Sequence, residues 1–143
     1  MSGAALSAII LAGGHVDLSD RIMANTTVVG SPALAAETAI ASVTVKGAVS
    51  TALGVIVICK ASFTIGTSGV SYQLRTYHGT ASGTKLDDSG AVTAVATDLY
   101  STTVVAFDPS PKLPNQVYTT TLTIASGAAA STVSAVTIVA IAV

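Results

Sequence analysis

The residue types that most often take part in catalysis or metal binding are few in this chain and widely spaced. The two histidines are His15 and His78, and the single cysteine is Cys59. A metal site or a catalytic triad needs several such groups close together, and the sequence has no HxH, HExxH or CxxC spacing. The patterns of a phosphate-binding loop and of a nucleophile elbow are also missing. We therefore expect no catalytic residue, no cofactor, no bound metal and no enzyme activity.

Cys59 lies in the middle of residues 54–65 (GVIVICKASFTI), the most hydrophobic interior segment. A reactive cysteine needs a partly exposed and electropositive environment. We predict a buried and chemically inert thiol, with a nucleophilic cysteine as the alternative interpretation.

Two adjacent acidic residues, Asp87 and Asp88, precede a Ser-Gly pair and weakly resemble part of a calcium-binding loop. Asp108 and Asn115 would be the candidates for further oxygen ligands from a second loop. The alternating ligands and the closing glutamate of an EF-hand are absent, however. We expect a solvated pair of turn residues here.

Aromatic residues are sparse, since Trp is absent and the four tyrosines are Tyr72, Tyr77, Tyr100 and Tyr118. Sugar-binding β-sandwiches stack their ligands on exposed rings, so carbohydrate binding has little support. Tyr118 directly precedes a Thr-rich segment, and we expect a core or corner position for it. The glycosylation sequon at Asn25 is frequent by chance in a chain so rich in threonine, and no role is predicted for it.

The composition limits the class of protein further. Ala, Thr, Val and Ser make up more than half of the 143 residues, only 9% are charged, and the net charge is -1. Six scattered cations do not form the basic footprint of a nucleic-acid-binding protein, and disorder requires lower hydrophobicity or higher charge. A surface with so little charge favours self-association, so we expect much of it to be covered by other subunits. A soluble β-domain with a Thr/Ser coat is the alternative.

Both ends of the chain are apolar. Residues 4–14 have the length of a signal peptide, but no Lys or Arg precedes them, and we expect an N-terminal arm over residues 1–24 that docks on the domain or on a neighbouring subunit. Residues 113–143 carry no charge and are long enough to span a membrane. Regularly placed Thr and Ser interrupt this stretch, and its β-branched alternation favours buried strands instead.

Period-2 alternation predicts an all-β fold for residues 25–143. Apolar residues on both faces of 54–65 indicate a central strand covered on both sides, or one with a face used as an interface. A four-residue turn then predicts a hairpin with 70–77, and residues 78–90 and 108–115 are expected to be loops. We predict an antiparallel β-sandwich of about eight strands, most simply a single jelly roll. The predicted strands are 26–29, 38–46, 54–65, 70–77, 91–97, 102–107, 117–124 and 132–142.

In the residue pattern of its segments and in its strand order, the chain resembles small β-sandwich virion proteins of bacteriophages, of the single jelly-roll coat or decoration kind. The likeness covers residues 25–143. The segments that carry it are TVVGSP (27–32) with ETAI (37–40), FTIGTSGV (63–70) with the strand ending at 75, QVYTTTL (116–122) and STVSAV (131–136).

The resemblance implies a non-enzymatic structural protein that assembles into or onto a viral capsid, as a coat protein or as a decoration (cement) protein. It would be located in the virion after synthesis in the host cytoplasm. Its partners would be further copies of itself, often as trimers, and other capsid proteins, with neither nucleic acid nor membrane expected. The N-terminal arm would lie across a neighbouring subunit. The alternative functions are a carbohydrate- or receptor-binding module and a subunit of a cell-surface filament.

Overall fold

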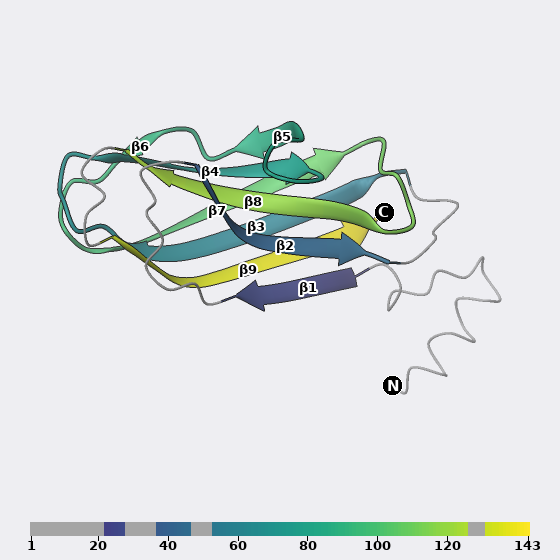
Figure 1. Ribbon diagram of the computed structural model, residues 1–143, viewed down its shortest axis with the longest axis horizontal. Coiled ribbons are helices and arrows are strands. Elements are labelled where there is room, and N and C mark those ends of the chain that lie inside the picture. The colour runs from purple at the N-terminus through teal and green to yellow at the C-terminus, as the bar shows by residue number, and fades with distance from the viewer. Residues whose placement is uncertain (1–21, 28–36, 47–52, 126–130) are drawn as a thin grey trace.

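The fold is a sandwich of two antiparallel sheets, seen in a computed structural model that describes residues 22–27, 37–46, 53–125 and 131–143 (Figure 1). Sheet A has the strand order β1-β9-β3-β7, and sheet B has the order β2-β8-β4-β5, with the short β6 paired to β4. The predicted all-β sandwich is confirmed. The strands are β1 (Ile22–Thr27), β2 (Thr38–Val45), β3 (Val55–Thr64), β4 (Ser71–His78), β5 (Thr84–Asp88), β6 (Val92–Thr93), β7 (Leu99–Asp108), β8 (Gln116–Ile124) and β9 (Thr132–Ala142).

The strand order is that of a single jelly roll. The chain pairs β1 with β9, β2 with β8, β3 with β7 and β4 with β5, so that each pair lies inside the previous one like the turns of a rolled-up hairpin. Rolling then joins β9 to β3 in sheet A and β8 to β4 in sheet B. This arrangement of two Greek keys is one of the ways in which a small all-β domain builds a closed core from two packed sheets.

The hydrophobic core lies between the two sheets. Alternation points every second residue of β3 inward, from Val55 to Phe63, and these side chains are fully buried. The ring of Phe63 packs edge to face against the ring of Tyr72, which belongs to the opposite sheet, and the ring centroids are 5.0 Å apart. The core residues are mostly small and β-branched, and the aromatic Tyr118 and Phe63 are the largest of the fully buried side chains.

The predicted hairpin between residues 54–65 and 70–77 is wrong. The two strands, β3 and β4, belong to different sheets, and the segment between them crosses from one sheet to the other. Gly69 there adopts φ 80°, and its amide bonds to the carbonyl of Ala94. Both strands have an apolar face that must be buried. Placing the two strands in opposite sheets of the sandwich buries these faces as well as a hairpin would.

Two further boundaries differ from the sequence prediction. Residues 78–90 are not a continuous loop, because β5 runs from Thr84 to Asp88 and pairs with β4. Only the two-residue strand β6 lies within the strand predicted for 91–97. The next strand, predicted for 102–107, is β7, and it begins earlier, at Leu99. The alternation of β4 is confirmed, with Tyr72 and Leu74 buried inward. The loop expected at 108–115 begins one residue later, because β7 includes Asp108, and residues 109–115 contain no strand.

Residues 1–21, including His15 and most of the predicted arm, lie outside the described residues, and β1 begins at Ile22. Within the part of the chain that the structure describes, no helix has the length and apolar character needed to cross a membrane.

Candidate functional site

The jelly roll brings together three polar side chains that are distant in sequence: His78, Asp108 and Tyr118. They come from the end of β4, the end of β7 and the start of β8. The Tyr118 hydroxyl donates to Oδ2 of Asp108 over 2.8 Å, and Nδ1 of His78 lies 2.9 Å from the same oxygen. The backbone amide of Ser110 donates to the other oxygen, Oδ1. We call these three residues the His78–Asp108–Tyr118 cluster.

This cluster is built to hold the two sheets together. Asp108 is only 3% exposed and Tyr118 is fully buried, so neither offers a reacting atom to a molecule in solution. Burial raises the pKa of the Tyr118 hydroxyl above its usual range, and the hydrogen bond to Asp108 raises it further. The neutral Tyr118 phenol donates a hydrogen bond to the buried Asp108 carboxylate, and this bond offsets part of the cost of burying that carboxylate. His78, which carried no predicted role, therefore belongs to a structural contact.

Cys59 is fully buried in the core, as predicted. Burial raises the pKa of its thiol to about 11, although a hydrogen bond with Thr120 lowers it in part. A thiol with that pKa is almost entirely protonated at neutral pH, which agrees with the inert side chain expected from the sequence.

Asp87 and Asp88 lie at the end of β5, where the chain turns toward β6. Oδ2 of Asp88 is 2.5 Å from Nζ of Lys85, and its Oδ1 accepts the amide of Gly90. The hydrogen bond from Lys85 and that from Gly90 lower the pKa of this partly exposed carboxyl to about 2. Asp108 is committed to the buried cluster, and no group of three or more potential metal ligands occurs among the described residues.

A second polar network, which the sequence analysis did not find, covers part of the outer face of sheet B. Oε1 of Glu37 accepts hydrogen bonds of 2.6 Å from Tyr77 and from Thr121, and Oε2 pairs with Arg75 at 2.9 Å. These partners are 40, 84 and 38 residues from Glu37 in the sequence. No local motif connects positions so far apart, and the only signal was that Glu37 is the single glutamate of the chain.

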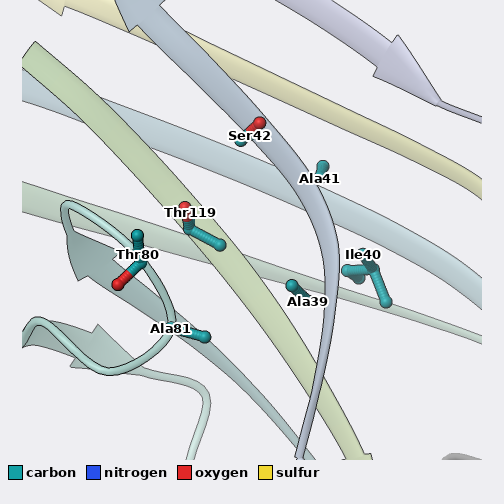
Figure 2. A pocket seen from close by; sticks show the side chains of 7 residues that line it. All are labelled: Ala39, Ile40, Ala41, Ser42, Thr80, Ala81 and Thr119. Atoms are coloured by element: carbon teal, nitrogen blue, oxygen red, sulfur yellow. The ribbon is translucent and has the colours of Figure 1, made fainter.

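Beside this network a shallow groove of about 520 Å³ runs over β8. Figure 2 shows Thr119 of β8 at its floor, with β2 on one side and the loop after β4 on the other. Its lining has alanine, threonine, serine and isoleucine side chains and no titratable group, so it offers shape but no acid–base chemistry. The lining residues are Ala39, Ile40, Ala41, Ser42, Thr80, Ala81 and Thr119.

The outer face of sheet A is different, because at one end its exposed side chains are apolar. Two rows of three residues run across β7, β3 and β9 there, as the strand register shows. Val105 and Phe107 are 56% and 50% exposed, and the other four are half-buried. We call this surface the apolar patch, and its residues are Ile56, Ile58, Val105, Phe107, Val139 and Ile141.

No protein-family model matches the sequence, and no curated protein matches it by sequence. Solved structures do share its fold. A chain from the structure of infectious bursal disease virus, Gx strain, has a TM-score of 0.55 and 10% identity, over 85% of this chain and 32% of that chain. A chain from the T13 particle of the same virus has a TM-score of 0.52 and 15% identity, over 90% of this chain and 33% of that chain.

Both matched chains come from structures of this virus, and the likeness shows that the present chain shares their β-sandwich fold. It spans about a third of the length of the capsid chains that it matches. A pilus protein of Bacillus endospore appendages is also similar, with 16% identity over 86% of this chain and 89% of that chain. Its TM-score of 0.45 is too low for this likeness to bear on fold or function.

Proposed function

We propose that this chain is a non-enzymatic structural protein of a virion, which self-assembles into a viral capsid or onto its surface as a coat or decoration protein. The observation that carries the proposal is the apolar patch, displayed on the outer face of a capsid-like jelly roll. A protein that remains alone in water rarely exposes a contiguous apolar surface of this kind, and such surfaces mark sites of association.

The polar networks support a structural role as well. Acids and bases that lie close together in the described residues bond to one another, as Asp108 does to His78 and Glu37 to Arg75. Their geometry joins strands and sheets, and the buried members offer no atom to a substrate. Catalytic acids and bases would instead converge on an accessible cavity.

More specifically, we propose that the virus is a bacteriophage and that the assembly unit is a homo-oligomer such as a trimer. Other capsid proteins would be further partners. The protein would be made in the host cytoplasm and located in the virion. The likeness of segments 27–32, 63–70 and 116–122 to phage virion proteins supports this source. The low content of charge supports permanent contact with other subunits.

Light scattering of the purified chain over a dilution series tests the proposal. We expect a stable oligomer or larger particle whose mass does not fall on dilution. Electron microscopy of the same sample then separates the two forms, because a coat protein forms closed shells and a decoration protein forms small oligomers only. A chain that is monomeric at every concentration would overturn the proposal.

A further inference from the structure

We propose that β7 is a docking edge, which pairs antiparallel with β7 of a second copy and joins the two A sheets into one continuous sheet. The inference rests on the proposed function and deepens it, because it assigns a contact between subunits to the backbone of one strand. Sheet A, with the order β1-β9-β3-β7, ends at β7, so this strand has a neighbour on one side only among the strands that the structure describes.

The backbone groups on the free side of β7 can be identified residue by residue. The amide of Ile65 donates to the carbonyl of Asp98, which extends the β3–β7 ladder by one hydrogen-bonded pair. In an antiparallel ladder such pairs alternate with pairs that are not hydrogen-bonded. Every even-numbered residue of β7 therefore directs its N–H and C=O toward β3, and every odd-numbered residue directs them away from β3. The odd-numbered residues are Leu99, Ser101, Thr103, Val105 and Phe107.

These outward backbone groups have few partners among the described residues. Oδ1 of Asp98 accepts the amide of Leu99 over 2.7 Å. The N–H and C=O groups of the other four odd-numbered residues have no hydrogen-bond partner in the described part of the chain. All five residues are also exposed. An exposed row of donors and acceptors along a strand is the site at which a further strand is added to a sheet.

β7 lacks the features that prevent edge-to-edge pairing at the other marginal strands. Natural sheets block their edges with short strands, charged side chains, proline or bulges. β5, at one margin of sheet B, has five residues, three of which are charged, and its pairing with β4 contains a register shift. The pairing of β2 with β8, at the other margin, also contains a shift, and β1 has only six residues. β7 has ten residues, pairs with β3 without a shift, and carries neither charge nor proline from Leu99 to Phe107.

A second copy fits this edge because it supplies the same edge. With a two-fold axis at Thr103, Val105 lies opposite the partner's Ser101, and Phe107 lies opposite the partner's Leu99. Each free N–H then meets a carbonyl of the other copy, and one symmetric contact satisfies both edges. Phe107 and Leu99, which are 50% and 61% exposed, come into contact as a cross-strand pair. A strand of any other origin would cover β7 but would leave its own outer edge unpaired.

The charges near β7 permit this pairing. Lys60 lies beside Thr103 on β3, so the two copies of Lys60 are separated by three strand spacings, or about 14 Å. This separation exceeds the Debye length of about 8 Å at physiological salt, so their repulsion is weak. Asp98 lies just outside the overlap of residues 99–107. Asp108, at the other end, points inward and bonds to Tyr118.

Two substitutions at one position separate the backbone edge from the side chain. Val105→Pro removes an outward N–H and leaves the ladder to β3 intact, because proline is tolerated where the N–H of an edge strand faces away from the sheet. Val105→Thr is the matched control, since it keeps the N–H and the β-branched shape. We expect Val105→Pro to weaken self-association at least ~100-fold by light scattering. Val105→Thr should change it less than about 3-fold. Thermal melting establishes that each variant is folded.

Two results with folded variants would overturn the inference. Undiminished association of Val105→Pro would show that the edge is not used. An equal loss in Val105→Thr would show that the contact is made by side chains on the outer face of sheet A and not by the backbone of β7.

Disulfide trapping tests the pairing without a change to the backbone, and it decides the question alone if Val105→Pro does not fold. Thr103→Cys places a thiol on the two-fold axis, where the facing Cα atoms would be about 5.5 Å apart, a distance that a disulfide spans. Thr137→Cys is the control, because Thr137 is also exposed on the outer face of sheet A, in the same row but two strands away from the edge. Cys59 is buried and does not interfere. Under mild oxidation we expect at least ~10-fold more disulfide-linked dimer from Thr103→Cys than from Thr137→Cys. Equal yields, or a higher yield from Thr137→Cys, would overturn the inference.

The two proposals fail in distinguishable ways. If the unmodified chain assembles but position 103 gives no trapped dimer and folded Val105→Pro assembles equally well, the docking edge is wrong and the structural role stands. If the unmodified chain is monomeric at every concentration, self-association fails and the inference falls with it.

Discussion

The hydroxyl of Tyr118 in sheet B donates a 2.8 Å hydrogen bond to Oδ2 of Asp108 in sheet A. Both residues are buried, and the same carboxylate is contacted by Nδ1 of His78. The ends of β4, β7 and β8 are thereby joined by one acidic side chain. Since the core between the sheets consists largely of small residues, this polar contact contributes to the alignment of the two layers.

Removing the Tyr118 hydroxyl should therefore destabilise the fold. We expect Tyr118→Phe to lower the free energy of unfolding by about 1–3 kcal/mol, because a buried acceptor loses a donor. Urea denaturation measures this change. The control is Tyr100→Phe, whose hydroxyl bonds to the exposed backbone of Ala96, where water can replace it. The control should cost less than about 0.5 kcal/mol. Equal losses in the two variants would contradict the role of the buried contact.

Glu37 should make stability depend on acid pH. Burial raises the pKa of Glu37, but hydrogen bonds from Thr121 and Tyr77 and the charge of Arg75 together bring it below its ordinary value of 4.5. The ionised form thus stabilises the folded chain at pH values above 4.5, and this contribution is lost as the pH falls through the lowered pKa. We expect Glu37→Gln to be less stable than the unmodified chain at pH 7, and the difference to shrink below pH about 4. Urea midpoints measured across this range test it, and a difference that stays constant with pH would refute it.

The Cys59 thiol should be protected in the folded chain. Since it is fully buried and its pKa is raised to about 11, a thiol reagent reaches it only when the structure opens. We expect Ellman's reagent at pH 8 to react at least ~1000-fold more slowly with the native chain than with the urea-unfolded chain. Similar rates in both states would show that β3 opens readily.

Gly54 should not tolerate a side chain. A Cβ atom there would collide with the ring of Phe107 and would lie 2.6 Å from the carbonyl oxygen of Asp108. We expect Gly54→Ala to lower the free energy of unfolding by about 1–3 kcal/mol, as overpacking does. In a Phe107→Ala background the ring is gone but the carbonyl remains, so part of the loss should persist. A loss that vanishes completely there would assign the whole effect to the ring.

The sequence was sufficient to predict the fold class, because alternation is a local property. In β4, Tyr72 and Leu74 point inward as their spacing predicts. The partner of each strand was harder to predict. The four small residues 66–69 are compatible with a hairpin or with a crossing between sheets. In the structure residues 65–70 form a crossing between β3 and β4. β5 was missed because Leu86 is its only apolar residue, which suffices at the edge of a sheet.

The buried polar contacts could not be predicted from the sequence for a related reason. His78 and Asp108 are 30 positions apart, and they meet only because β4 and β7 end at the same side of the sandwich. The apolar patch was indicated in part, since the alternation of 54–65 left Ile56 and Ile58 facing away from the core. Its other four residues come from strands whose position beside β3 follows from the topology alone.

The nested strand pairing also determines when the patch can exist. β9 follows every other strand along the chain, yet it lies inside sheet A, between β1 and β3. Val139 and Ile141 therefore join Ile56 and Val105 only after contacts between the most distant segments have formed, which is the slow part of folding for such topologies. A chain that is still being synthesised has β3 and β7 but lacks β9, so the apolar patch is complete only after the last strand has joined sheet A.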